Sequence, residues 1–300
     1  MPTLYTHQSS NIRKTWLLFT IFLVVIIGVG FLFSQIYGDP SIVVIAVVFA
    51  VFMSFLSYWH SDKIVLKMAN ATPITRESNI ELYRIVENLS ITAGLPIPRL
   101  YLVHEDAPNA FATGRDPEHA VVAVTSGLLQ KLNKSELEGV IAHELSHIGN
   151  RDMLVGTVAV VLVGFIAVLS DIFLRSMFFG GGRRKSGGGN AAIIMLLVGI
   201  ALSILAPISA KLLQLAISRK REFLADASGV LLTRYPEGLA SALQKISSDQ
   251  TPMAVAKNST SHLWLDDPFK DKKRTSFFHK LFATHPSVEE RIKNLLSNRV

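Results

Sequence analysis

The sequence predicts a mainly α-helical membrane protein, in which four apolar helices accompany a part built from a small β-sheet and further helices. Hydrophobic residues make up 49% of the 300 residues and the mean hydropathy is +0.37, which is high for a soluble protein. Each of four apolar stretches has about 20 residues, the length that crosses a hydrocarbon core of about 30 Å. They are Trp16–Ile36, Ser41–Trp59, Met153–Leu174 and Ala191–Leu215.

Positive charges at the ends of the first two stretches predict their orientation. Arg13 and Lys14 precede the first stretch, Lys63 and Lys67 follow the second, and the turn between the stretches has no Lys or Arg. The positive-inside rule therefore places the N-terminus and the segment after Trp59 in the cytoplasm. The third and fourth stretches flank a basic, Gly-rich loop, 180–189, so they either cross the membrane or form a hairpin that does not fully cross. Both arrangements keep residues 63–150 and 217–300 on one side.

These boundaries divide the chain into four regions. An N-terminal extension with two spans (1–62) precedes the first soluble part (63–150), and two further apolar helices (151–216) precede the second (217–300). In the first soluble part, apolar residues at helical spacing from Leu82 to Leu89 predict a helix that Gly94 and Pro96 end. Three short runs of branched and aromatic residues predict strands. They are Arg99–Val103, Asn109–Thr113 and Ala120–Val124.

Helices are also predicted in the second and fourth regions, from the residues at their ends. Asn133, with Glu136 three residues later, predicts a capping box that opens a helix over the segment before Asn150. Beyond residue 217 we expect a helix over Pro236–Ile246, a polar loop over Ser247–Lys273, and a last helix that begins at Ser287.

The segment His143-Glu144-Leu145-Ser146-His147 is an H-E-x-x-H motif that lies just before the third apolar stretch. On a helix, residues i and i+4 share a face, so His143 and His147 can each give one nitrogen to the same metal ion. Glu144 can then act as general base toward a water molecule. A chance match on a solvated helix is the alternative, and this composition yields one in about one chain in a hundred.

A third ligand for this metal is predicted from a charged segment after the fourth stretch. A catalytic zinc site keeps three protein ligands and one open position. Glu222 and Asp226 are four residues apart and share a helix face, which suits Glu222 as the oxygen ligand and Asp226 as the carboxylate that orients a ligating imidazole. The alternative is an ordinary exposed pattern of charges on a wet helix face.

The second strand is a candidate for substrate binding. Metallopeptidases commonly hold a peptide as an added strand at a sheet edge, through backbone hydrogen bonds. The run Asn109, Ala110, Phe111, Ala112 and Thr113 is our candidate for that edge. An internal strand without substrate contact fits the same pattern.

Charge and cysteine content exclude several classes of function. The net charge is +7, but many cations, such as Lys211, Arg219, Lys220 and Arg221, flank apolar stretches, where anionic lipid headgroups are the expected partners. No nucleic-acid-binding motif is present, so we expect no nucleic-acid partner. The chain has no Cys, which excludes disulfides and thiolate ligands.

With these residues assembled, the chain resembles the HtpX-type membrane zinc metallopeptidases, which are related to the CAAX prenyl endopeptidases. Four motifs in the family's order carry the resemblance: Asn109–Gly114, Val140–His147, Ser218–Asp226 and Thr284–Ser287. The resemblance implies a zincin-type protease domain with one Zn²⁺ per chain, His143, His147 and Glu222 as ligands and Glu144 as base. It also implies a multi-pass protein of the cell inner membrane that cleaves damaged or misassembled membrane proteins on the cytoplasmic side, under envelope stress. A polar N-terminal extension and the Gly-rich basic loop depart from the family.

His285 and Arg291 lie in or near the last motif and are candidates to stabilise the oxyanion or contact substrate. Their structural alternatives are a His-Pro turn and an exposed helix Arg. Two other classes stay open for the whole chain. An intramembrane site-two-type protease is disfavoured because His143 precedes the apolar run and no Leu-Asp-Gly triplet occurs. A non-enzymatic metal-binding membrane module has no need of Glu144.

Overall fold

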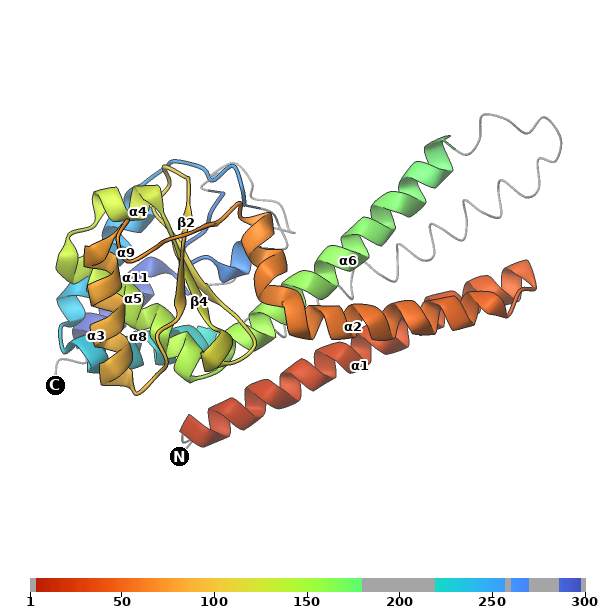
Figure 1. Cartoon of the computed structure of the whole chain (residues 1–300), viewed down its shortest axis with the longest axis horizontal. Helices are drawn as coiled ribbons and strands as arrows, with labels where there is room; N and C mark the ends of the chain where they lie inside the picture. The colour runs from red at the N-terminus through yellow and green to blue at the C-terminus, as the bar shows by residue number, and fades with distance from the viewer. Residues whose placement is uncertain (1–3, 180–218, 257–259, 270–285, 298–300) are drawn as a thin grey trace.

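Long helices on one side of a compact α/β part dominate the computed structural model, which describes residues 4–179, 219–256, 260–269 and 286–297 (Figure 1). Helix α1 (Leu4–Tyr37) and helix α2 (Ser41–Met68) form an antiparallel pair joined by a short turn. Both are long and apolar enough to cross a membrane. Apolar side chains of α2 such as Val44, Val48 and Phe52 are exposed, as expected of a lipid-facing surface. The first two predicted spans are therefore confirmed as membrane-capable helices.

The third apolar stretch forms helix α6 (Asp152–Phe179), which packs along α1 and α2. It follows α5 (Lys134–Gly149) after a bend of 82° at Asn150 and Arg151, and the bent pair counts as a third span only if it is one broken helix. The fourth stretch, Ala191–Leu215, lies outside the described residues. In the described part of the chain, two helices rather than four are therefore membrane-capable on their own.

The small sheet has the strand order β1-β2-β4-β3, with β2 parallel to β4 and both outer pairs antiparallel. The predicted strands are confirmed to within one residue at each end, and the two-residue strand β1 was not predicted. The strands are β1 (Thr72–Pro73), β2 (Arg99–Val103), β3 (Ala110–Thr113) and β4 (Val121–Thr125).

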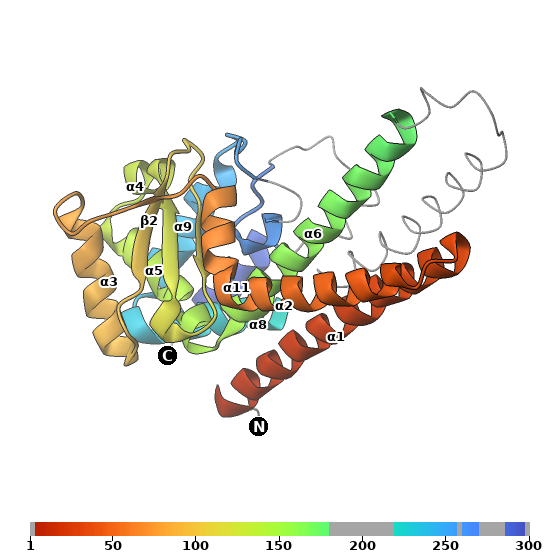
Figure 2. The same cartoon turned by 45° about the vertical axis from the view of Figure 1, so that its right-hand side comes forward.

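The two faces of the sheet pack on different layers, since side chains alternate along each strand. Leu100, Ala112 and Val122 face a core shared with α3 (Ile80–Ala93) and α5. Phe111 and Val121 face the opposite way, into a cluster with the end of α2, with α6 and with Trp264. Figure 2 shows the sheet between these layers. Strand β3 lies at the sheet edge.

Local end signals set the helices of the α/β part. Helix α3 ends at Gly94, which adopts a left-handed conformation (φ +65°). Helix α5 opens with the predicted capping box, in which the Asn133 side chain accepts from the Glu136 N–H and the Glu136 carboxylate accepts from the Asn133 N–H. The other helices are α4 (Ser126–Lys131), α8 (Arg219–Thr233), α9 (Pro236–Ser248) and α11 (Val288–Ser297), with 3₁₀ turns η1 (Pro117–His119) and η3 (Ser261–Leu263).

Of the polar stretch from Ser247 to Lys273, predicted as a loop, the structure describes residues 247–256 and 260–269, which are largely irregular beyond α9 but are not a simple solvated loop. Met253, Trp264 and Leu265 are buried, and the Trp264 ring packs edge-on against Phe111 with ring centroids 4.7 Å apart. Because the segment is polar overall, its composition did not predict that these few apolar residues would be buried and pack the segment against β3.

Candidate metal centre

Helices α5 and α8 bring His143, His147 and Glu222 together. Their candidate ligand atoms all lie within 4.8 Å of one another. The two Nε2 atoms are 3.1 Å apart, and the Glu222 carboxylate oxygens lie 3.8 Å from His143 Nε2 and 3.7 Å from His147 Nε2. Ligand atoms at about 2.0–2.1 Å from a tetrahedral zinc are separated by about 3.4 Å. The three side chains therefore fit one zinc ion.

Close contact between α5 and α8 makes this arrangement possible. A Cβ atom at Gly229 would lie 3.0 Å from the His143 backbone nitrogen and 3.2 Å from its Cα. Such contacts would be tighter than most Cβ contacts, so the glycine lets α8 lie this close to α5 without a shift of the backbone. Asp226 and Glu222, about one and two turns earlier on α8, thereby reach the histidines. Periodicity in the sequence does not reveal this role of Gly229, because the contact joins distant segments.

Asp226 and Arg291 lie behind His143. The Asp226 carboxylate is 2.9 Å from His143 Nδ1, and Arg291 donates to both Asp226 oxygens at 2.6 and 2.9 Å. Burial raises the pKa of Asp226, but the charge of Arg291 and the hydrogen bond from His143 outweigh this effect and hold the pKa at about 2. Asp226 therefore stays ionised and can accept a hydrogen bond from the Nδ1–H group of His143, which leaves Nε2 of that ring available to bind a metal.

Asp152 plays the corresponding part for His147 and was missed in the sequence. Its carboxylate lies 3.2 Å from His147 Nδ1, and its other oxygen accepts from the Asn11 amide at 2.6 Å. Asn11 also donates to the Asn150 carbonyl at 3.1 Å, and Arg221 lies 3.8 Å from Asp152. Helix α1 thus contacts Asp152, the carboxylate that supports His147. Only the position of Asp152, five residues after His147, could have suggested it.

The imidazole of His147 holds a proton strongly. Burial lowers the pKa of His147, but the hydrogen bond with Asp152 and the negative charge of Glu222 outweigh it and raise the pKa to about 9. A metal ion must displace this proton, so binding competes with protonation and weakens as the pH falls.

Glu144 is 2% exposed, beside the two histidines. Burial raises its pKa, while the positive charges of His143 and His147 oppose the rise. A carboxylate whose pKa moves toward neutrality suits a general base.

The candidate substrate strand lies at the sheet edge, but part of it is already paired. Asn109 pairs through its side-chain amide with the backbone of Asp266, at 3.0 and 3.2 Å, and the Ala110 carbonyl accepts from the Leu265 N–H at 3.0 Å. The register of β3 against β4 points the backbone groups of Ala112 to the free edge. Among the described residues, the unpaired part of the candidate edge is therefore confined to Ala112.

The two candidates for oxyanion stabilisation, Arg291 and His285, have different outcomes. Arg291 is 1% exposed, so it is not an exposed helix Arg, and it contacts the centre. Besides Asp226, its guanidinium donates to the Leu265 carbonyl at 3.3 Å and lies 3.9 Å from Glu222. His285 lies outside the described residues.

An H-E-x-x-H helix, a carboxylate from a second helix and membrane-capable helices define a membrane metallopeptidase. Comparison with known proteins agrees with this class. The profile of peptidase family M48 matches residues 76–299, and the chain belongs to this family. Membership in a peptidase family counts against a non-enzymatic metal-binding module.

Several relatives are similar over almost the whole chain, and each is named a protease HtpX homolog. The relative from Thermoanaerobacter pseudethanolicus is 47% identical over 299 residues, and that from Caldanaerobacter subterraneus subsp. tengcongensis is 46% identical over 299 residues; each alignment covers 98% of both chains. The Pyrococcus furiosus relative is 46% identical and covers 94% of both. The crystal structure of S. mikatae Ste24p shares the fold, with a TM-score of 0.50, 20% identity, and coverage of 94% of this chain and 67% of that chain.

The distinction between the three candidate ligands and the two carboxylates behind the histidines predicts a ranking of zinc affinities. Glu222→Ala leaves two protein ligands and should lower affinity most, whereas Asp226→Ala and Asp152→Ala should each cost about 10- to 100-fold. Chelator-competition titration of the purified full chain measures this, with Glu138→Ala, whose partly exposed carboxylate pairs with Lys134, as control. A larger loss for Asp226→Ala than for Glu222→Ala would reverse the roles of the two carboxylates.

The Asn11 contact predicts that α1 tunes the metal centre. Asn11→Ala removes a hydrogen bond to Asp152, worth about 0.5–1.5 kcal/mol, and should weaken zinc binding about 2- to 10-fold. The control is Thr20→Ala, which removes a hydroxyl bonded only within the same helix, to the Trp16 carbonyl. Equal affinity of the Asn11 variant and the wild type, by the same titration, contradicts the coupling.

Proposed function

We propose that this chain is an integral membrane zinc endopeptidase that cleaves membrane or misfolded proteins on the cytoplasmic side of the cell inner membrane. The observation that carries the proposal is the set of His143, His147 and Glu222, spaced for one tetrahedral zinc ion, with Glu144 beside it. Membership of peptidase family M48 and relatives named protease HtpX homolog support it.

Peptide hydrolysis follows from the roles of these residues. Zinc held by His143, His147 and Glu222 would supply an acidified water and polarise the scissile carbonyl. Glu144 accepts the proton of the attacking water and then delivers it to the leaving amine. Asp226 and Asp152 keep the imidazoles oriented with Nε2 toward the metal.

The residues for oxyanion stabilisation and substrate binding are assigned from the contacts of Arg291 and of strand β3. Three of the five N–H donors of Arg291 are used by Asp226 and Leu265, which favours a role in positioning Asp226 and Glu222. His285 stays the other candidate for the oxyanion. A peptide strand would pair with β3 at Ala112, and Leu265–Asp266 would limit how far it extends toward Asn109.

The cytoplasmic orientation is supported by charge. Arg13 and Lys14 lie near the start of α1, and Lys63 and Lys67 lie in the last turns of α2, beside the α/β part. These cations favour the cytoplasmic face. A site immediately beside membrane helices suits substrates that are themselves membrane proteins, which is the basis for a role in quality control and the stress response.

Replacement of Glu144 tests the chemistry. Glu144→Gln removes the proton acceptor but leaves all three proposed ligands, so casein cleavage should fall about 10²- to 10⁴-fold with zinc content unchanged near one per chain. Glu138→Gln makes the same chemical change elsewhere on α5, at a carboxylate that pairs with Lys134, and this variant should cleave normally. Wild-type cleavage by a zinc-loaded Glu144→Gln protein would remove Glu144 from the mechanism.

Single cysteines test the orientation, because the chain has none of its own. A cysteine at the exposed Ser248 should resist a membrane-impermeant maleimide in intact cells and react after lysis. A cysteine at the exposed Asp39, in the α1–α2 turn, should react from outside. Labelling of the Ser248 position in intact cells would place the metal centre across the membrane and end the cytoplasmic assignment.

A further inference from the structure

A cavity of about 450 Å³ lies where α2 leaves its apolar segment and meets the sheet. Phe55 and Trp59 form an apolar wall, and three cationic side chains, Lys63, Arg99 and Arg115, line the rest with a single carboxylate, Asp62. The metal centre uses none of these residues. The side chains that line the cavity carry a net positive charge even when His60 and His119 are neutral.

Arg99 and Arg115 are held in place by ion pairs, and Lys63 supplies the excess positive charge. The Arg115 guanidinium lies over the Trp59 ring, 4.7 Å from its centroid, and its Nε atom pairs with Asp116 at 3.2 Å, while Arg99 pairs with Asp62 at 2.6 Å. Lys63 is exposed and, within the described residues, makes no ion pair. An uncompensated ammonium beside a fixed guanidinium is suited to phosphate.

The loop that carries Arg115 is closed by a glycine. Gly114 has a φ of +136°, and a Cβ atom there would lie 2.6 Å from the His119 carbonyl oxygen. Side-chain-bearing residues rarely adopt this backbone. Arg115 is therefore presented to the cavity by a tight turn that directly follows β3.

The position of the cavity identifies the source of the phosphate. Exposed apolar side chains run along α2 from Val44 to Phe55 and end at Trp59, and charged residues begin just after it. A tryptophan at such a boundary marks the level of the lipid headgroups. A phosphate bound by Lys63 and Arg115 can thus belong to a lipid whose acyl chains lie along α2.

We propose that this cavity binds the phosphate headgroup of an anionic phospholipid. Lys63, Arg99 and Arg115 contact the phosphate, and Phe55 and Trp59 contact the start of the acyl chains. Such a lipid fixes the depth and tilt of the α/β part at the membrane surface. The inference does not depend on peptidase activity.

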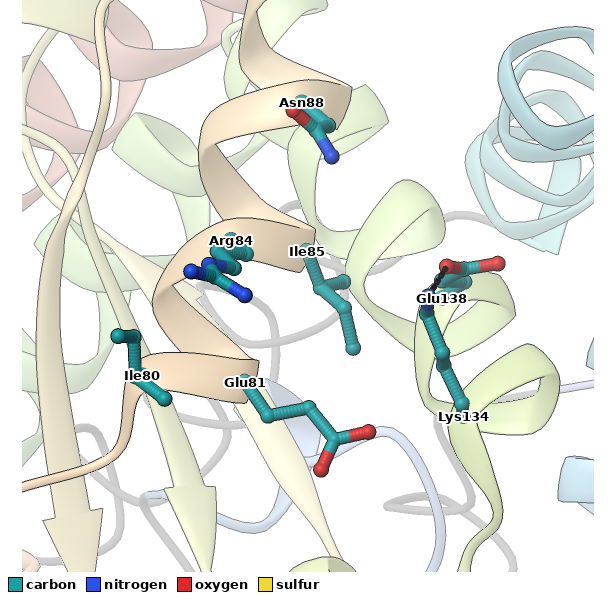
Figure 3. Close-up of a pocket in the computed structure, with 7 residues that line it drawn as sticks. All are labelled: Ile80, Glu81, Arg84, Ile85, Asn88, Lys134 and Glu138. Atoms are coloured by element: carbon teal, nitrogen blue, oxygen red, sulfur yellow. Dashed lines mark ion pairs between the residues drawn. The ribbon is translucent and has the colours of Figure 1, made fainter.

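A matched control comes from a second hollow, of about 350 Å³, between α3 and α5 (Figure 3). It also has two cations, Arg84 and Lys134, but they are balanced by Glu81 and Glu138, and Lys134 lies 3.9 Å from Glu138. The double variant Arg84→Gln/Lys134→Gln therefore changes the net charge as much as Lys63→Gln/Arg115→Gln does.

Native mass spectrometry of the full chain in detergent, titrated with phosphatidylglycerol or phosphatidylcholine, tests the proposal. Wild type and the Arg84/Lys134 double variant should bind phosphatidylglycerol at least 10-fold more tightly than phosphatidylcholine, and the Lys63/Arg115 double variant should lose this preference. Lys63→Gln alone, which removes no ion pair, should weaken binding about 3-fold or more and serves if the double variant does not fold.

Competition arms separate a lipid from free phosphate. Inorganic phosphate and glycerol phosphate at millimolar concentration should not displace phosphatidylglycerol. Displacement by either would show a soluble-phosphate site and overturn the lipid assignment. Equal losses in the two double variants, or equal binding of the two lipids by the wild type, would reduce the effect to general surface charge and overturn the site.

Discussion

Helices α5 and α8 meet at Gly229, where α8 lies against the backbone of His143, and the position of Glu222 and Asp226 relative to the histidines depends on this contact. A side chain at this position would require a shift of a few tenths of an ångström between the two helices, which would move Glu222 and Asp226 because both are on α8. A tetrahedral zinc site tolerates little displacement, because its ligand atoms must sit about 3.4 Å apart. A glycine that performs no chemistry thus helps two separate motifs to form one site.

Pairing of buried charges explains the arrangement of the groups behind the two histidines. His143, Glu144, Asp226 and Arg291 are all at least 96% buried, and an unpaired charge at such depth costs several kcal/mol. Arg291 neutralises Asp226 through two hydrogen bonds, and Asp152 is satisfied by Asn11 and His147. Each histidine therefore has an ionised or ionisable partner on its Nδ1 side, so both Nε2 atoms point to the position of the metal.

Local signals made much of the fold predictable. The capping box at Asn133 and the left-handed Gly94 depend on residues a few positions apart, and the strand at Arg99–Val103 was predicted at its observed bounds. The motif spacing also indicated which side chains would come together as candidate metal ligands. Contacts between distant segments could not be predicted this way. Asn11 and Asp152 are 141 positions apart, and the packing of Trp264 on Phe111 joins a polar segment to a strand.

The bend of 82° between α5 and α6 relates the centre to the membrane. His147 lies just before the bend and Asp152 just after it, so their hydrogen bond spans the point where the chain turns toward the apolar helices. Asn11 of α1 bonds to the same carboxylate. A fragment without α1 would leave one Asp152 oxygen facing only Arg221 at 3.8 Å, which weakens the support of His147. Helices α1 and α6 are therefore linked to the candidate metal centre through Asn11 and Asp152.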